Sequence, residues 1–553
     1  MKARRPELLI VLAGLLLFVP GLGAVHLFDW DEINFAEIGR EMIVSGDYFR
    51  PQVDFEPFWE KPPLFMWMQV ACMKAFGVGE FAARLPNALC GIVTLLVLFR
   101  IGSRLRDRTF GWLWVLAYTG SILPHLYFRS GIIDPWFNLF IFLSLHAWIL
   151  LGWGRDDRPT GWPGAGTARY ALLLGAFLGL GMLTKGPVAL LILGLTAGVH
   201  WIMQRFRIPI RLAHALIGLL TMVAVSFLWF GTDWLMNGSW FLDTFVKYQI
   251  RLFSTPDAGH GGFPGYHVAV LLLGCFPASL FAIQEWLAPG EASAEQRDYR
   301  RWMSILFFVV LILFSIVKSK IVHYSSMCYF PLTHLAAVRM HRIWSRREGF
   351  GWTRFAVGAL GTLIAVVVIA LPFVALHPEA VRPLLAADPF AQGNLDAAVH
   401  WSGLEASAGA WLLLALVAAH VFHSRGRPRE SLVAVFGGTA LFVTFTLYFF
   451  INNIEAYSQR AAIRFFEGHA GERCWVATWN YRSYAPWFYA RTTEAVPANE
   501  VLATGPIDRP VHLSCKVTAE EEVRALGTFH ETGRANGFVF WRRDPEPRSG
   551  PWN

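Results

Sequence analysis

The sequence predicts a polytopic α-helical membrane protein that ends in a small α/β domain. Hydrophobic residues make up 55% of the 553 residues and charged residues only 16%, so a water-facing surface would be short of charge. The 24 Trp and 45 Phe suit lipid-facing helices with aromatic belts. Long apolar runs follow one another along most of the chain, and the pattern changes after residue 455. This composition excludes a disordered, collagen-like or disulfide-scaffold protein.

Membrane spans are predicted from runs of roughly 20 mostly apolar residues, the length that crosses a hydrocarbon core about 30 Å thick. The runs lie at 7–25, 82–100, 110–124, 136–153, 170–183, 186–203, 212–234, 266–287, 302–317, 326–340, 353–375, 408–424 and 431–452. About thirteen spans result. An odd number of spans places the two ends of the chain on opposite sides of the membrane.

Basic residues gather in every second loop, at 2–5, 100–108, 155–169, 205–211, 297–301, 339–354 and 425–429. Cytoplasmic loops carry such an excess of Lys and Arg. We therefore expect a cytoplasmic amino terminus and a carboxyl-terminal segment on the outer side. The net charge of +8 then reflects membrane topology and not nucleic-acid binding.

The chain divides into a membrane part, residues 1–454, and a terminal segment, residues 455–553. In the terminal segment ERCWVATW, RPVHLSC and GFVFWRR are typical of short strands, and SYAPWFYARTT and TAEEEVRALGT of helices. We expect a small α/β domain with a structural or docking role, because the segment holds no catalytic motif. Its two cysteines, Cys474 and Cys515, either form a disulfide or remain two buried thiols.

The first outer loop, residues 26–81, is too long and too acidic for a simple connection. Its stretch 33–44 places apolar residues near one face and Glu37, Arg40 and Glu41 on the other. This pattern predicts an amphipathic helix that lies in the membrane interface. A second such helix, begun by two prolines, follows it.

Three carboxylates stand where chemistry is expected. Asp31 and Glu32 precede the first of these helices, where they either cap free N–H groups or serve as a base or a sugar-holding group. Asp134 lies at the edge of a span directly before Pro135, and a carboxylate at membrane depth is costly unless it is paired or functional. Capping of the helix that Pro135 opens is the alternative.

Basic side chains on the predicted outer side are typical either of simple anchors or of a site for a lipid phosphate. They are Lys61, Lys185, Lys318, Lys320 and His323, next to Tyr324, with Arg251 and His260 in a second long outer loop, residues 235–265. Several cations on one face favour the phosphate site. A divalent metal ion is a candidate partner of Glu60, His260 and His267, although no spacing requires it. The Gly-rich GHGGFPGYH has no Walker or Rossmann context, which argues against a nucleotide.

These features suit an enzyme that acts on a phosphate-linked lipid, with carboxylates for a sugar and cations for the phosphate. A lipid-linked sugar transporter is the alternative outside the enzymes. Transporters place ionisable residues inside their spans, often in inverted repeats. The predicted spans are mostly free of charge and contain no such repeat, which favours the enzyme.

Several motifs resemble those of a known family. DWDEINFAEIGREM, FEPFWEKPPLFMWMQ and GEFAARLPNAL resemble the start of the lipid A 4-amino-4-deoxy-L-arabinose transferases, relatives of the protein O-mannosyltransferases among the GT-C glycosyltransferases. GIIDPWFNLF, GLGMLTKGPVALLILG and KSKIVHYSSMCYFPL are similar to later segments of that family. The resemblance covers residues 1–345. Asn34 and Phe35 stand where the aminoarabinose enzymes have Arg and Tyr, a departure that concerns the sugar more than the reaction.

The resemblance implies an inverting transfer of a sugar from undecaprenyl phosphate on the periplasmic side of the bacterial inner membrane. It implies Asp31 and Asp134 as the active-site carboxylates and Glu60 as a metal contact. The residues expected to bind the donor lipid or the sugar are Glu32, Lys61, Lys185, Arg251, Lys320, His323 and Tyr324.

The acceptor decides what Asp31 must do. We expect lipid A as the acceptor, with a protein or another glycan as the alternative. A lipid A phosphate is already ionised and needs no general base, whereas a hydroxyl acceptor needs one. Both roles for Asp31 stay open at this level.

Overall fold

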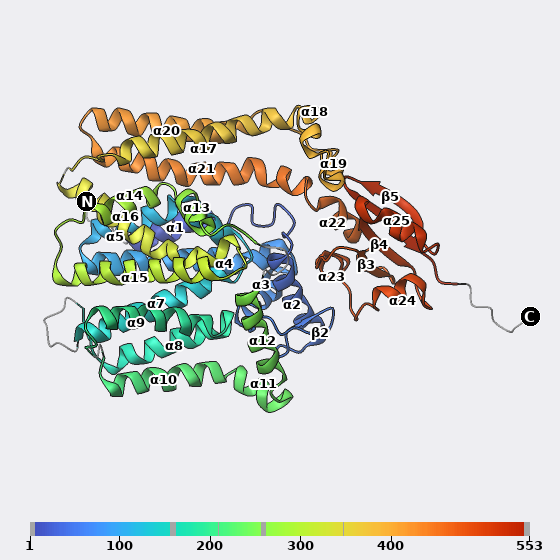
Figure 1. Cartoon of the computed structure of the whole chain (residues 1–553), viewed down its shortest axis with the longest axis horizontal. Coiled ribbons are helices and arrows are strands. Elements are labelled where there is room, and N and C mark those ends of the chain that lie inside the picture. Colours follow the sequence, from blue (N-terminus) through green and yellow to red (C-terminus); the bar gives the residue numbers. More distant parts are fainter. Residues whose placement is uncertain (1–5, 155–161, 208–209, 256–260, 347, 547–553) are drawn as a thin grey trace, which may run out of the picture.

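The computed structural model describes residues 6–154, 162–207, 210–255, 261–346 and 348–546. Long helices lie side by side in one bundle, and a smaller unit with a β-sheet lies beyond one end of it (Figure 1). His260 and parts of the basic clusters at 2–5 and 155–169 lie outside the described residues.

The bundle is built from helices at the places where apolar runs predict them. They are α1 (Pro6–Phe18), α4 (Glu80–Leu105), α5 (Arg108–Thr119), α7 (Asp134–Trp153), α8 (Ala168–Lys185), α9 (Val188–Met203), α10 (Leu212–Phe227), α15 (Ala294–Ile316), α16 (Tyr329–Arg346), α17 (Thr353–Ala375), α20 (Ala406–Ser424) and α21 (Pro428–Ala456). Helices satisfy their own backbone hydrogen bonds, which lipid requires of any spanning segment.

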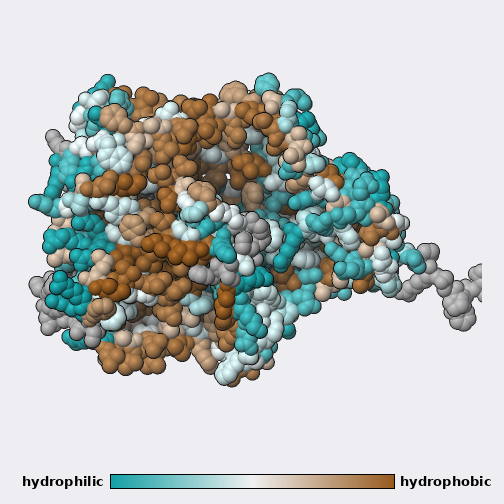
Figure 2. Space-filling model, in the orientation of Figure 1, coloured by the Kyte–Doolittle hydropathy of each residue, from teal (hydrophilic) through white to brown (hydrophobic). Residues whose placement is uncertain are grey.

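Six helices of the described residues are long and apolar enough to cross a membrane, or up to eight if each of two bent helix pairs counts as one span. A hydrophobic band covers the bundle, with hydrophilic residues toward its two ends (Figure 2). The chain is therefore a multi-pass membrane protein. The count of thirteen spans stays a prediction.

Two of the predicted spans are not straight helices. α10 and α11 (Phe230–Asn237) meet at 48°, and α13 (Tyr266–Gly274) and α14 (Ala278–Leu287) meet at 109°. The second break falls at Pro277, which has no N–H to continue a helix ladder. The predicted span over 266–287 is therefore two helices joined at a sharp bend.

Glycines bring α8 and α10 close together. A Cβ atom at Gly175 would lie 2.2 Å from the carbonyl oxygen of Gly218, and one at Gly179 would lie 2.7 Å from Cβ of Val225. The spacing of four residues places Gly175 and Gly179 on the same face of α8. Small residues let helix backbones approach where lipid supplies no hydrophobic drive. This contact fixes α8 and thereby Lys185 at its end.

The first outer loop contains both predicted helices. It forms α2 (Asp31–Ser45), a short hairpin of β1 (Gln52–Val53) and β2 (Glu56–Pro57), and α3 (Leu64–Phe76). α2 packs against α3 and against a helix of the C-terminal unit.

The polar face of α2 is buried and does not meet water. Glu37, Arg40 and Glu41 are at most 3% exposed. Arg40 donates to both oxygens of Glu37 and to the carbonyl of Thr492 at 2.7 Å. The C-terminal unit therefore covers the polar face of α2, and the place of this helix in the membrane interface stays a prediction.

The C-terminal unit, residues 460–543, contains a four-stranded sheet in the order β3–β4–β6–β5. Its elements are α22 (Arg460–Glu467), β3 (Trp475–Trp479), α23 (Ala485–Ala490), α24 (Asn499–Thr504), β4 (Val511–Lys516), α25 (Glu520–Ala525), β5 (His530–Ala535) and β6 (Phe538–Arg543). β3 and β4 are parallel, and the other pairs are antiparallel. The sequence predicts three of these strands and misses β5, whose mostly exposed residues show no apolar alternation.

Cys474 and Cys515 are both free thiols. Cys474 directly precedes Trp475 at the start of β3, whereas Cys515 is in register with Trp479 at the end of β3. At 3.3 Å per residue the two cysteines are roughly 16 Å apart along the sheet, well beyond the reach of a disulfide. The disulfide alternative is therefore excluded.

Candidate active site

The helix ends that face the C-terminal unit bring together several of the predicted site residues. Asp134 opens α7, Lys185 closes α8, and Asp31 opens α2. Lys61 lies in the loop before α3, and His323 lies in the short helix η3 (Val322–Cys328). Five distant parts of the sequence therefore contribute to one place.

Asp134 and Lys185 form the centre of this group. Lys185 Nζ donates to Asp134 Oδ1 at 2.7 Å, and the two side chains are 16% and 3% exposed. The N-terminus of α7 favours the negative charge and the C-terminus of α8 favours the positive one. Asp134 Oδ2 is buried and has no hydrogen-bond partner among the described residues. A ligand that brings a donor would therefore find a ready acceptor at Oδ2.

Asp31 and His323 lie at the more open side of the group. His323 Nε2 is 3.6 Å from Asp31 Oδ2, and the Asp31 side chain is 39% exposed. Burial is the main cause that lowers the pKa of His323, and Lys185 and Lys61 add to this, while Asp134 and Asp31 oppose it. The four charged neighbours thus all act on this one imidazole.

Lys61 belongs to the same group. Burial lowers the pKa of its ammonium, and Lys185 contributes in the same direction, whereas Glu60, Asp31 and Asp134 oppose the change. An ammonium with a lowered pKa gains from an additional anion, because the anion stabilises its charged form. A phosphate bound next to Lys61 would therefore stabilise the charged form of its ammonium.

Tyr248 of α12 (Trp240–Ser254) connects the loop of Lys61 to the second outer loop. Its hydroxyl donates to Glu60 Oε2 at 3.1 Å, and Lys61 Nζ lies 5.1 Å from the centre of its ring. The guanidinium of Arg251 lies 5.2 Å from the same ring. Tyr248 is not among the site residues predicted from the sequence. It lies three residues before Arg251, a spacing that places both side chains on one face of α12.

Tyr324 and Ser326 hold η3 against the central pair. Lys185 Nζ lies 5.4 Å from the ring centre of Tyr324. Asn138, one helical turn after Asp134, donates to Ser326 Oγ at 2.8 Å. These contacts fix η3, and with it His323, relative to the start of α7.

The structure does not bring Lys320 into the group. Its ammonium donates to the carbonyls of Phe314, Ser315 and Val317 at the end of α15. Cations favour this position because the last carbonyls of a helix lack partners. The geometry therefore gives Lys320 a capping role and does not support it as a phosphate ligand.

Glu32 also does not join the group around Asp134 and Lys185, because its carboxylate binds Arg84. Both of its oxygens accept from the guanidinium of Arg84, at 3.1 and 2.7 Å, and Oε2 also accepts from Phe28 N at 2.9 Å. The residue is 6% exposed. Its carboxylate joins the start of α2 to α4, so a structural role fits it better than contact with a sugar.

The chain is similar in sequence to several known transferases. A family model described as dolichyl-phosphate-mannose-protein mannosyltransferase matches residues 60–230. Two proteins named undecaprenyl phosphate-alpha-4-amino-4-deoxy-L-arabinose arabinosyl transferase are similar over longer stretches. The protein from Enterobacter sp. (strain 638) is 26% identical over 389 residues, 68% of each chain. That from Erwinia tasmaniensis is 26% identical over 435 residues, 75% of each chain. The predicted resemblance is confirmed.

A solved structure extends the similarity to the fold. ArnT from Cupriavidus metallidurans bound to undecaprenyl phosphate has a TM-score of 0.78 and 20% sequence identity, and the match covers 99% of both chains. The apo structure of the same protein has a TM-score of 0.76 over 97% of both chains. The chain therefore shares the fold of this ArnT.

The predicted metal contact of Glu60 stays a prediction. His260 lies outside the described residues. Among the residues that are described, Glu60 belongs to no group of three ligand side chains close enough to share an ion. Its carboxylate instead accepts from Tyr248.

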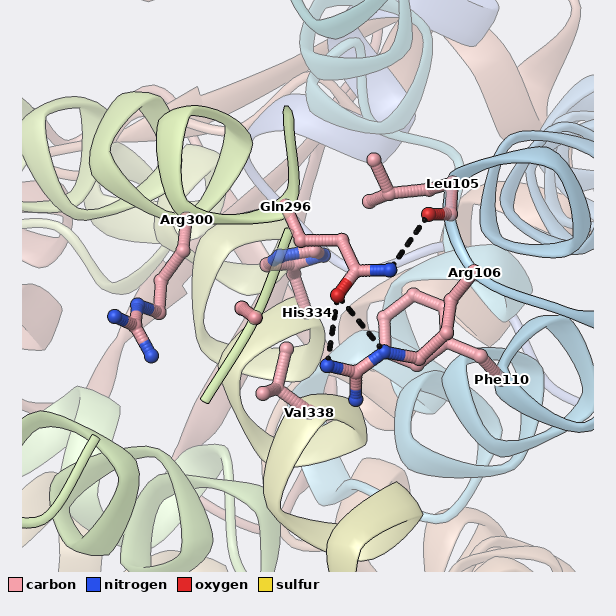
Figure 3. A pocket seen from close by; sticks show the side chains of 8 residues that line it. Leu105, Arg106, Phe110, Gln296, Arg300, His334 and Val338 are labelled. Carbon is pink, nitrogen blue, oxygen red and sulfur yellow. Dashed lines mark hydrogen bonds between the residues drawn. The ribbon is translucent and has the colours of Figure 1, made fainter. Parts of the chain in front are cut away.

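A small cavity lies at the end of the bundle opposite the candidate active site, and it is not an alternative substrate site. Leu105, Arg106, Gln296 and His334 line it, and the Gln296 amide joins Arg106 to the carbonyl of Leu105 (Figure 3). Its volume of about 10 Å³ holds at most a single water. α4 runs 26 residues from the first outer loop to this cavity, a distance of about 39 Å. No sugar or lipid headgroup fits there.

Proposed function

We propose that the chain is an inverting glycosyltransferase that moves 4-amino-4-deoxy-L-arabinose from undecaprenyl phosphate to a phosphate of lipid A. The convergence of Asp134, Lys185, Lys61 and Asp31 carries the proposal, because it combines carboxylates for a sugar with cations for a phosphate. The names of the arabinosyl transferases support the donor and the sugar. The ArnT structure with undecaprenyl phosphate supports a place for that lipid in this fold.

In the transfer, an acceptor oxygen attacks the anomeric carbon and the bond from that carbon to the donor phosphate oxygen breaks. The electron pair of this bond goes to the phosphate, so undecaprenyl phosphate leaves with added negative charge. Lys61 and Lys185 are placed to stabilise that charge, and one such donor lowers a barrier by about 3–4 kcal/mol. Lys185 donates one N–H to Asp134, and its other two N–H groups are available to donate to the phosphate.

The two carboxylates have different tasks in this proposal. Asp134 Oδ2 accepts a hydrogen bond from an amino or hydroxyl group of the sugar and fixes its orientation. Asp31, on the open side, faces the acceptor. A lipid A phosphate needs no base, so Asp31 orients the acceptor by accepting a hydrogen bond from a hydroxyl group of lipid A or from a bridging water. With a hydroxyl acceptor, Asp31 takes the proton.

We place the site on the periplasmic side of the bacterial inner membrane. In this arrangement residues 1–454 form the transmembrane catalytic part and residues 455–553 a periplasmic α/β domain. Basic residues such as Arg106 and Arg300 lie at the other end of the bundle, where the cytoplasmic surface requires them. A basic end opposite the site supports this orientation.

The test uses purified full-length protein in lipid nanodiscs with labelled undecaprenyl-phosphate aminoarabinose and lipid A. We expect label on lipid A and release of undecaprenyl phosphate, both absent with Asp134→Asn. If the label arrives only on a protein or another glycan, that molecule and not lipid A is the acceptor. In proteoliposomes, donor that crosses the bilayer intact without transfer would overturn the enzyme in favour of the transporter.

A further inference from the structure

A group of metal-ligating side chains lies in the C-terminal unit, outside the candidate active site. It consists of His469, Glu472, Cys474 and His512, and one ligand atom from each lies within 4.8 Å of the others. We name these four residues the turn cluster. The first three lie in the turn between α22 and β3, and His512 lies in the neighbouring strand β4.

The turn brings its three ligands together through its backbone. Glu472 N donates to the carbonyl of His469 at 3.1 Å, and Cys474 N donates to the carbonyl of Glu472 at 3.0 Å. Gly471, between them, has a φ of 80°, which a residue with a Cβ rarely adopts. The compact turn therefore depends on the sequence His-Ala-Gly-Glu-Arg-Cys.

The strand register adds the fourth ligand. Val476 in β3 lies opposite His512 in β4. Alternate residues of a strand share a face, so Cys474 lies on the same side of the sheet as Val476 and hence as His512. The ring of Phe465, 6.2 Å from that of His512, lies on this side as well. The sheet thus directs a thiol and an imidazole into one partly apolar place.

Two side chains of the turn cluster, His512 and Cys474, make no side-chain hydrogen bond to the residues that the structure describes. His512 is only 6% exposed, and Cys474 is a partly exposed free thiol. An imidazole nitrogen and a thiol without a protein partner are available to bind a metal ion. Only His469 and Glu472 are joined, with 2.8 Å between Nδ1 and Oε2. A cation bound by all four would supply the missing partners.

We propose that the turn cluster binds one Zn²⁺ ion. Two imidazoles, a carboxylate and a thiolate form a ligand set that suits zinc and is too soft for magnesium or calcium. The ligands of a tetrahedral zinc at 2.0–2.3 Å lie roughly 3.3–3.8 Å apart, so the four atoms need to move together only slightly. Binding releases the thiol proton of Cys474 to the solvent.

One rearrangement accompanies binding. The rings of His469 and His512 now stack with 3.6 Å between their centres and 25° between their planes. Stacked rings direct their lone pairs side by side, so the rings have to turn for both to meet one ion. Arg542 lies opposite His512 on β6, and Asp544 pairs with it at 2.7 Å, which limits its repulsion of a cation.

A second group, His26, Glu80 and Glu467, satisfies the same distance test but has a different character. The two ring nitrogens of His26 already contact Glu455 at 2.8 Å and Glu467 at 3.3 Å. An imidazole with both nitrogens in ion pairs has no lone pair for a metal. The turn cluster is the better zinc site for this reason.

Thiol labelling of the unmodified full-length protein tests the proposal. Cys474 and Cys72 are both partly exposed, and only Cys474 belongs to the cluster. With ZnCl₂ present, we expect maleimide to modify Cys474 at least about tenfold more slowly and Cys72 at an unchanged rate, as read by mass spectrometry of the peptides. Equal rates at Cys474 with and without zinc would overturn the proposal.

Variants give a second readout with zinc alone as the probe. We expect Cys474→Ser/His512→Gln to bind one zinc ion fewer per chain than the unmodified protein, measured by metal analysis after gel filtration. His530→Gln, which changes a histidine of the same sheet outside the cluster, is the matched control and should retain the full number. Cobalt should give a thiolate charge-transfer band in the unmodified protein. Its absence, or an unchanged zinc number in the double variant, would contradict the site.

Discussion

Lys185 at the end of α8 donates a hydrogen bond to Asp134 at the start of α7, with 2.7 Å between Nζ and Oδ1. The packing of α7 on α8 sets this distance, and the opposite helix termini stabilise the opposite charges. The pair therefore exists before any substrate arrives. A site organised in this way avoids the free-energy cost of reorganisation during the reaction.

Lys185→Ala tests whether the pair has a structural as well as a chemical role. Removing one partner of a buried ion pair costs about 3–5 kcal/mol, so Tm should fall and transfer should be lost. Lys185→Ala/Asp134→Asn removes the uncompensated charge and should regain most of the lost Tm without regaining activity. Tryptophan fluorescence during heating and the transfer assay measure the two effects. A double variant as unstable as Lys185→Ala would contradict the pairing.

Asp31→Asn should separate activity from stability. The Asp31 side chain is 39% exposed and makes one long contact, to His323, so we expect little change in Tm. We expect the rate of transfer to fall by at least about a hundredfold, as for loss of a general base or an orienting group. Glu56→Gln, an exposed acidic residue of the same loop, is the control and should keep full activity. Near-normal turnover of Asp31→Asn would remove Asp31 from the mechanism.

Lys61→Ala should weaken binding of undecaprenyl phosphate. A charge-assisted hydrogen bond to a phosphate is worth about 1.5–3 kcal/mol, which corresponds to roughly 10–150-fold in Kd. Lys74→Ala removes a cation from α3 in the same outer loop, where it lies over the ring of Tyr48, and should leave Kd unchanged. Titration of the lipid in detergent measures both. Equal Kd values for Lys61→Ala and the unmodified protein would exclude Lys61 from the phosphate site.

The sequence predicts those parts of the structure that depend on local pattern. Apolar runs locate the helices because lipid leaves no other backbone structure. Asp134 and Lys185 stand out because charges at the ends of spans are costly without a partner. Their mutual contact follows from adjacent helices in the chain, which tend to pack together.

The remaining features depend on contacts between distant residues. Nothing near Glu32 reveals that Arg84 takes both of its oxygens, and nothing near Lys320 reveals that it turns back onto α15. The polar face of α2 resembles a water-facing one until the C-terminal unit covers it. Tyr248 is one of several aromatic residues in its helix, and only the fold places it between Glu60 and Arg251.

Glu32→Gln distinguishes a structural carboxylate from one that binds substrate. Glu32 and Arg84 are buried and bound to each other, so the neutral side chain leaves a buried guanidinium without its counter-charge. We expect Tm to fall by several degrees, with KM for the donor nearly unchanged in the protein that remains folded. A variant with unchanged Tm and a raised KM would restore Glu32 to the sugar site.

The pH dependence of stability tests how the C-terminal unit is attached to the first outer loop. Asp54 Oδ1 accepts from Val496 N at 2.8 Å, and burial raises the pKa of the Asp54 carboxyl from 3.8 to about 7. The folded chain thus binds this proton more tightly than the unfolded chain. The stability that Asp54 contributes is complete below about pH 4, falls as the pH rises, and is lost above about pH 7.

Asp54→Asn keeps an acceptor for Val496 and cannot ionise. We therefore expect its Tm to exceed that of the unmodified protein at about pH 8 and to fall less between about pH 4 and pH 7. Burial and Glu37 also raise the pKa of Glu41 from 4.5 to about 9, so a decline between about pH 4.5 and pH 9 should persist in the variant, without the part that Asp54 adds. Asp47→Asn, in the same loop but exposed, is the control. Parallel Tm profiles for Asp54→Asn and the unmodified protein would show that the contact with Val496 does not control this attachment.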